Sequence, residues 1–241
     1  MASRSDVGVC ERLRKLILAY PRSTLASLTL LALAPFLAKP FNMDDPLFIW
    51  AAKNLFDHPG NPYGFTVNWF GSATPMWDAT KNPPLCSYYL SFFGEMFGWS
   101  EVALHGAMLL PASAAILGTF RLARRFCKNP FFAALVVLFT PAFLVSATTV
   151  MSDVLLLAFW IWAVVFWVER KDGHTRTGKP CLSGVLMGLA ALTKYYGATL
   201  IPLLLCYELL KHRRVKLLYP LVIPVAVLIA YSWWTSRLYG R

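Results

Sequence analysis

Residues 182–211 have the sequence LSGVLMGLAALTKYYGATLIPLLLCYELLK, in which Lys194 interrupts an apolar stretch. The stretch fits one long helix or two short helices, residues 182–193 and 198–210. In the second case they join at residues 193–197, where a glycine permits a turn and two tyrosines suit a membrane interface. A limb of about 12 to 13 residues reaches roughly 20 Å, less than the roughly 30 Å hydrocarbon core of a bilayer. We therefore expect two short helices, with Lys194 in a recess below the outer headgroups.

The composition places this stretch in a membrane protein. Of the 241 residues, 57% are hydrophobic and only 15% are charged, where soluble domains carry about 25% charged residues. The mean hydropathy is +0.52. These values exclude a disordered chain, a nucleic-acid-binding module and a secreted disulfide scaffold. The predicted fold class is an all-α, polytopic membrane helical bundle.

Basic clusters predict the topology. Four clusters, within residues 4–15, 121–128, 170–179 and 211–216, hold 16 of the 23 Lys and Arg residues. If all four are cytoplasmic, an even number of crossings separates consecutive clusters. The aromatic run 85–99 then cannot cross, and the two limbs of residues 182–210 both do. About seven crossings follow, with a cytoplasmic N-terminus and an outer C-terminus: residues 16–38, 102–120, 131–150, 154–168, 182–193, 198–210 and 217–234.

The only long connection is the first extracytoplasmic loop, residues 39–99, within a single module covering residues 1–241. Asp45 followed by Pro46 has the pattern of a helix N-cap and first helical residue, which predicts a helix over residues 46–56. Residues 85–97 place aromatic side chains on one helical face and small or polar ones on the other. We expect both helices to lie along the membrane surface.

Two acids in the predicted outer segments are candidate catalytic groups. Asp44 directly follows the first span, where partial removal from water would make its carboxylate more basic. Asp153 precedes the fourth span, on the same predicted face as Lys194. Two acids and a recessed cation suit a reaction in which a base activates a hydroxyl while a phosphate departs.

Each of these candidate residues also has a simpler structural interpretation. Asp44 is equally well a solvated loop acid, and Asp45 and Asp153 are equally well helix caps. His105 either lines the recess or packs in the protein. The sequence has no metal-ligand spacing, so no metal site is predicted. A divalent cation bridging Asp44 or Asp45 to Asp153 stays open, but no cofactor is expected to be obligatory.

The order of several short motifs resembles the GT-C-type integral membrane glycosyltransferases, in the branch of protein O-mannosyltransferases and lipid A aminoarabinose transferases. The resemblance covers residues from about 40 to 210. The matching motifs are Asp44-Asp45, Asn82-Pro83-Pro84-Leu85 before Tyr88-Tyr89, Phe97-Gly98-Trp99, Ser152-Asp153 and residues 188–194, GLAALTK.

The resemblance implies a transferase that moves a sugar from a polyprenyl-phosphate donor to an acceptor, usually with inversion. By position, Asp44 matches the family's catalytic acid, Asp153 its second external acid and Lys194 the lysine facing the donor phosphate. Two positions depart from the family pattern. Asn82 stands where a lysine is common, with Lys81 one residue earlier, and Leu47 stands where many members have arginine.

Lys81 is accordingly a second candidate for the donor phosphate. Asp45, Asn82, His105, Tyr88 and Tyr195 are candidates for lining the site. The implied localisation is the plasma (inner) membrane, with the active site extracytoplasmic. The acceptor, whether lipid, glycan or protein, is not identified.

Other interpretations remain open. The chain is a minimal enzyme, a fragment corresponding to the family's N-terminal conserved module, or one half of a complex with a second subunit. It is alternatively a non-catalytic module that binds lipid-linked sugar. A transporter or flippase is less favoured, because acids lie on one predicted face rather than at the centre of spans. No nucleic-acid partner is expected.

Overall fold

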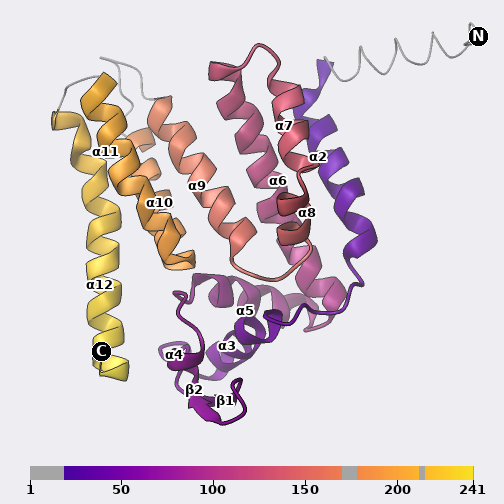
Figure 1. Cartoon of the computed structure of the whole chain (residues 1–241), viewed down its shortest axis with the longest axis vertical. Coiled ribbons are helices and arrows are strands. Elements are labelled where there is room, and N and C mark those ends of the chain that lie inside the picture. Colours follow the sequence, from indigo (N-terminus) through magenta and orange to yellow (C-terminus); the bar gives the residue numbers. More distant parts are fainter. Residues whose placement is uncertain (1–18, 170–177, 212–214, 241) are drawn as a thin grey trace, which may run out of the picture.

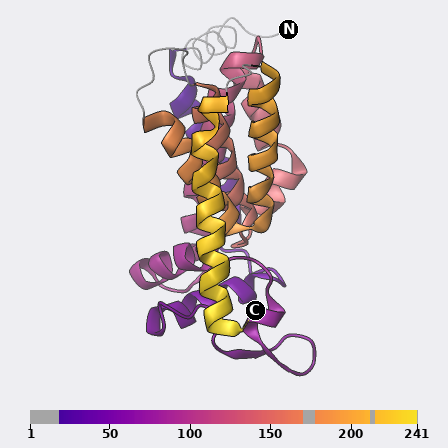
Figure 2. The same ribbon diagram turned by 90° about the vertical axis from the view of Figure 1, so that its left-hand side faces the viewer.

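The computed structural model describes residues 19–169, 178–211 and 215–240. It has two layers: a bundle of roughly parallel and antiparallel helices, and a smaller layer at one end (Figure 1). The turned view shows the same division, with the C-terminal helix running along the bundle and into the smaller layer (Figure 2). The bundle comprises α2 (Pro21–Leu33), α6 (Glu101–Phe126), α7 (Pro130–Leu138), α8 (Pro141–Ala147), α9 (Asp153–Val168), α10 (Gly178–Thr193), α11 (Leu200–Lys211) and α12 (Val222–Tyr239).

Length and composition identify the best candidates for membrane spans. Among the described residues, α6 and the segment Leu218–Tyr239 are each long and apolar enough to cross a membrane. The pair α7 and α8 would form a third span if the two count as one bent segment. Helices α9 and α10 are apolar but have 16 residues each, or about 24 Å of helix. The expected number of seven crossings stays a prediction.

The structure divides the span expected over residues 131–150 into two helices. Helices α7 and α8 meet at an angle of 62°. Pro141 cannot donate a backbone hydrogen bond and keeps the preceding residue out of the helical region. Thr140 accordingly has extended angles, φ −67° and ψ 128°, while its hydroxyl donates to the Val136 carbonyl at 2.6 Å.

The structure has two helices, not one, across residues 182–210. Helix α10 ends at Thr193, and the short 3-10 helix η2 (Tyr195–Thr199) leads into α11. A Cβ on Gly197 would lie 2.2 Å from the backbone carbon of Ala190. Only glycine therefore lets the turn pack so closely against α10, which is a stricter requirement than chain reversal alone.

The smaller layer contains the first loop. Its elements are α3 (Asp45–Asp57), β1 (Thr66–Asn68), β2 (Ala73–Pro75), α4 (Met76–Ala79) and α5 (Leu85–Phe97). The antiparallel hairpin β1–β2, with Val67 opposite Thr74, is a short addition to a fold that is otherwise helical, as expected, in the described residues. Gly71 turns the chain between the strands with φ +83°, a conformation that glycine adopts at little cost.

Helix α5 begins directly after Pro83-Pro84, and one of its faces packs against the rest of the protein. Cys86, Ser87, Leu90 and Gly94 are buried, whereas Phe92, Met96 and Phe97 are each at least 60% exposed. This exposed face is the one that the sequence places at the membrane surface.

One apolar core joins α2, α6, α7, α8 and α9. Leu25, Leu104, Ile116, Leu138 and Val154 are at most 1% exposed within it. A second core joins α9, α10 and α11, where Trp167, Met187 and Leu200 pack together. Helix α9 belongs to both cores, so its position is fixed from both sides.

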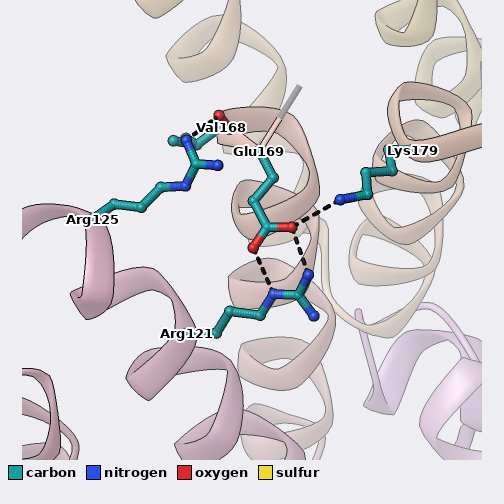
Figure 3. Close-up of polar contacts among 5 residues, drawn as sticks. All are labelled: Arg121, Arg125, Val168, Glu169 and Lys179. Atoms are coloured by element: carbon teal, nitrogen blue, oxygen red, sulfur yellow. Dashed lines mark hydrogen bonds and ion pairs between the residues drawn. The ribbon is translucent and has the colours of Figure 1, made fainter. Parts of the chain in front are cut away.

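An ionic network joins α6, α9 and α10 at the end of the bundle away from the smaller layer (Figure 3). Arg121 donates to both carboxylate oxygens of Glu169 at 2.6 Å, and Lys179 Nζ lies 3.2 Å from Glu169 Oε2. Arg125 donates to the Val168 carbonyl at 2.9 Å. Hydrogen bonds from Arg121 lower the pKa of Glu169 to about 2. The contacts place residues from two predicted basic clusters at the same end of the bundle: Arg121 and Arg125 from one, and Lys179 from the other.

Candidate functional site

An ion pair between Asp153 and Lys194 lies at the opposite end of the same helices. Asp153 is the first residue of α9, and Lys194 directly follows α10. Helices α9 and α10 run antiparallel and side by side (Figure 1). The start of one therefore meets the end of the other, and Lys194 Nζ lies 2.8 Å from Asp153 Oδ1. The side chains remain 23% and 37% exposed, so a ligand can reach them.

An apolar cavity of about 560 Å³ opens beside this pair. Asp153 and Tyr196 contribute to its wall, and the remainder comes mainly from apolar side chains of α7, α8 and α9. Those side chains include Val137, Phe143, Leu157 and Trp160. The break between α7 and α8 contributes Thr140 to the lining.

A smaller cavity of about 210 Å³ has a different character. Lys81, Asn82, Tyr195 and Trp77 line it, together with Tyr231, Thr235 and Tyr239 of α12. Tyr195 lines this cavity while its neighbour Tyr196 lines the apolar one. Lys194 directly precedes both tyrosines, and its Nζ lies 5.9 Å from the Tyr196 ring centroid.

Asp45 does not cap its helix, which corrects the expectation for this residue. Helix α3 begins at Asp45, and Asp44 occupies the N-cap position without a side-chain cap bond. The Asp45 side chain is fully buried. Its Oδ2 accepts from the Asn42 N–H at 2.7 Å and its Oδ1 from the Val150 N–H at 3.2 Å. Burial raises the pKa of Asp45, while these two hydrogen bonds lower it.

Asp44 is exposed to solvent and does not line either cavity. Its chain neighbour Asp45 bonds to Val150, three residues before Asp153. Asp44 therefore belongs to a segment that contacts the Asp153 loop, and the structure does not bring its carboxylate to Lys194.

His105 and Tyr88 lie apart from these cavities. His105 is buried, with Nδ1 3.2 Å from the Leu37 carbonyl and its ring 5.7 Å from that of Phe41. It is therefore a packed histidine and does not line the recess. Tyr88 donates to the Pro59 carbonyl at 2.6 Å and lines a separate apolar cavity of about 370 Å³ with α12.

Helix α12 contributes residues that were not among the predicted site residues. Tyr231, Thr235 and Tyr239 all line the smaller cavity. Tyr239 stacks on Trp77 with centroids 5.0 Å apart and donates to Asn61 Oδ1 at 2.9 Å. A four-residue spacing puts all three on one helical face, and this spacing was visible in the sequence.

Lys81 lies 3.5 Å from Asp78 and remains exposed. No group of three or more His, Cys, Asp or Glu side chains able to hold a metal lies together in the described parts of the chain. The divalent cation considered above stays untested. Both oxygens of Asp45 already accept backbone hydrogen bonds.

Comparison with known proteins defines the class. Residues 81–235 match the family model of dolichyl-phosphate-mannose-protein mannosyltransferases, and the chain belongs to this family. This match bears out the sequence resemblance to GT-C-type membrane glycosyltransferases. No curated protein sequence matches the chain.

The fold is similar to that of a solved structure. A crystal structure of ArnT from Cupriavidus metallidurans, bound to undecaprenyl phosphate, superposes with a TM-score of 0.68 at 19% sequence identity. The match covers 91% of this chain and 42% of that ArnT chain. The chain thus spans less than half the length of that structure.

Proposed function

We propose that this chain forms the donor site of a membrane glycosyltransferase that uses a polyprenyl-phosphate sugar. The observation that carries the proposal is the Asp153–Lys194 pair: Asp153 lines an apolar cavity, and the two tyrosines that follow Lys194 line this cavity and a smaller polar, aromatic one. A prenyl-phosphate sugar has three parts in the same order: an apolar tail, an anionic phosphate and a polar ring. Family membership and the undecaprenyl phosphate in the ArnT structure support this choice of ligand.

Each part of the donor has a matching surface. The tail enters the cavity of about 560 Å³, whose lining is mainly apolar. The phosphate meets Lys194, which would exchange part of its contact with Asp153 for the phosphate oxygens. The sugar occupies the smaller cavity, where Lys81, Asn82 and Tyr195 offer hydrogen-bond donors.

The proposed reaction is a direct displacement at the anomeric carbon. The acceptor hydroxyl oxygen forms the new bond to this carbon, and the bond from the carbon to the phosphate oxygen breaks. The leaving electron pair stays on the phosphate, whose charge Lys194 stabilises. Asp44 takes the hydroxyl proton as general base, and displacement from the opposite side inverts the anomeric configuration. Asp44 is exposed, so an acceptor hydroxyl can reach its carboxylate.

The orientation is part of the proposal. The site lies at the end of the bundle opposite the Arg121–Glu169–Lys179 network (Figures 1 and 3). Basic residues concentrate on the cytoplasmic side of membrane proteins. The sugar-transfer site would then face the extracytoplasmic side of the plasma membrane.

The direct test begins with the bound lipid. The protein is purified in mild detergent, and co-purifying lipid phosphates are identified by mass spectrometry. The identified polyprenyl-phosphate sugar is then radiolabelled and supplied in membranes containing the protein. We expect label to move from the lipid to an acceptor, and Lys194→Met to abolish most of this transfer while Lys53→Met, on the exposed side of α3, does not. Binding of the lipid without transfer by any preparation would instead support a non-catalytic binding module.

A further inference from the structure

A second role for the buried acid Asp45 follows from its partners. Its two carboxylate oxygens accept from the N–H of Asn42, three residues before it, and from the N–H of Val150, 105 residues after it. One oxygen holds Asn42, in the turn that leads into α3, and the other holds Val150, in the loop that leads into α9. The carboxylate thus bridges the segments that carry Asp44 and Asp153.

Two further contacts reach the same loop. Lys39 Nζ donates to the Thr148 carbonyl at 3.3 Å. Cys86 Sγ, on α5, lies 3.8 Å from the Val150 carbonyl. Residues 148–152 are therefore held by groups from three places in the first loop, and the Asp45 bond is the one formed with a carboxylate.

The surroundings of Asp45 show that its carboxylate is not free for a substrate. The side chain has no exposed surface, and it lines neither of the two cavities beside Lys194. The titratable groups that act on it electrostatically are His105 and Lys39. A carboxylate placed in this way can fix geometry, but it does not reach the reacting atoms.

The geometry points to Asp45 as a positioning residue that sets the relative placement of Asp44 and Asp153. In the diacidic motif Asp44-Asp45, the two carboxylates thus have separate tasks. Asp44 faces solvent and acts on the acceptor, whereas Asp45 faces inward and fastens the first loop to the start of α9. This inference rests on the proposed function for its catalytic consequence, but the link between the loops is independent of it.

Hydrogen–deuterium exchange measures that link without any activity assay. Asp45→Asn keeps the size of the side chain but replaces the carboxylate by an amide, which offers only one acceptor oxygen. We expect the amides of residues 148–152 and 42–45 to exchange about tenfold faster or more, because the N–H groups of Val150 and Asn42 lose their charged acceptor. Asp57→Asn, an exposed acid at the other end of α3, should leave both segments unchanged.

Kinetics then test the positioning role. We expect Asp45→Asn to lower kcat about tenfold or more and to change the KM for the lipid donor less than kcat, since the backbone N–H of Lys194 donates to the Ala190 carbonyl of α10. Asp45→Glu retains two acceptor oxygens and should recover more kcat than Asp45→Asn. Both values are taken per folded molecule, as measured by thermal unfolding.

Unchanged exchange at residues 148–152 in Asp45→Asn would overturn the link itself. Faster exchange with unchanged kcat would overturn the positioning role, leaving a structural bond only. If the wild-type protein transfers no sugar while exchange behaves as expected, the proposed function fails and the link between the loops stands.

Discussion

Lys194 meets Asp153 at 2.8 Å although 41 residues separate them, because α9 and α10 run antiparallel and pair their opposite ends. The same helix pair is joined at its other end by Glu169 and Lys179. Each end of the pair thus has one acid, at an end of α9, and one base, at an end of α10. The two pairs differ in surroundings: Asp153 lines a cavity, whereas Glu169 is enclosed by Arg121 and Lys179 (Figure 3).

The Asp153–Lys194 pair should respond asymmetrically to mutation. Lys194→Met removes the only group of the pair that attracts phosphate, and we expect undecaprenyl phosphate to bind roughly 10- to 100-fold more weakly, the size of a charge-assisted hydrogen bond. Asp153→Asn removes a carboxylate that competes for the ammonium, and we expect binding a few-fold tighter. Scintillation or mass-spectrometric binding assays in detergent measure both. Weaker binding in Asp153→Asn would show instead that this acid holds Lys194 in its productive position.

The turn after α10 should not tolerate any side chain at Gly197. In Gly197→Ala the new Cβ would meet the Ala190 backbone at 2.2 Å, so the turn that carries Lys194, Tyr195 and Tyr196 must shift. We expect the free energy of unfolding to fall by about 1 to 3 kcal/mol. Thermal unfolding in detergent compares Gly197→Ala with the control Gly60→Ala, where no atom lies within 4 Å of the added Cβ. Equal unfolding temperatures of the two variants would contradict this packing.

The Arg121–Glu169–Lys179 network gives a prediction about pH. Arg121 lowers the pKa of Glu169 from 4.5 to about 2. A lowered pKa means that folding favours the ionised form of Glu169. The stabilisation that this carboxylate contributes to the folded protein is therefore complete above pH 4.5 and disappears as the pH falls through about 2. Glu169→Gln should therefore destabilise the protein by about 1 to 2 kcal/mol at pH 7, where the pair is partly exposed to water.

Unfolding curves recorded from pH 7 to pH 2 measure that difference. The difference in free energy of unfolding between wild type and Glu169→Gln should stay constant down to pH 4.5 and then decrease towards zero. Glu95→Gln, at an exposed position on α5, serves as the control and should show no such difference. A difference that is as large at pH 2 as at pH 7 would rule out an electrostatic origin.

The sequence predicted those features that depend on local patterns. The two-helix division of residues 182–210 follows from Lys194 and the glycine turn, and the start of α9 differs by one residue from the predicted 154–168 run. Placing Asp153 and Lys194 on one face required only the parity of crossings between basic clusters, and the structure brings the two into contact.

The features that were missed depend on contacts between distant segments. Pro46 after Asp45 favours a helix cap in the sequence, whereas the bond of Asp45 to Val150, 105 residues away, leaves no local signal. The break at Pro141 was masked by the apolar character of residues 131–150 as a whole. The β1–β2 hairpin was missed because only three residues pair on each strand, too few for an alternating pattern to show.

The central claim is that Asp44 acts as the base in sugar transfer from a donor held at Lys194. Single-turnover transfer of labelled sugar from the polyprenyl-phosphate donor, measured in Asp44→Asn beside Asp57→Asn, tests it most directly. We predict a rate about 10² to 10⁴ times lower in Asp44→Asn, with undecaprenyl phosphate binding and the rate of Asp57→Asn unchanged. A wild-type transfer rate in Asp44→Asn would contradict the account.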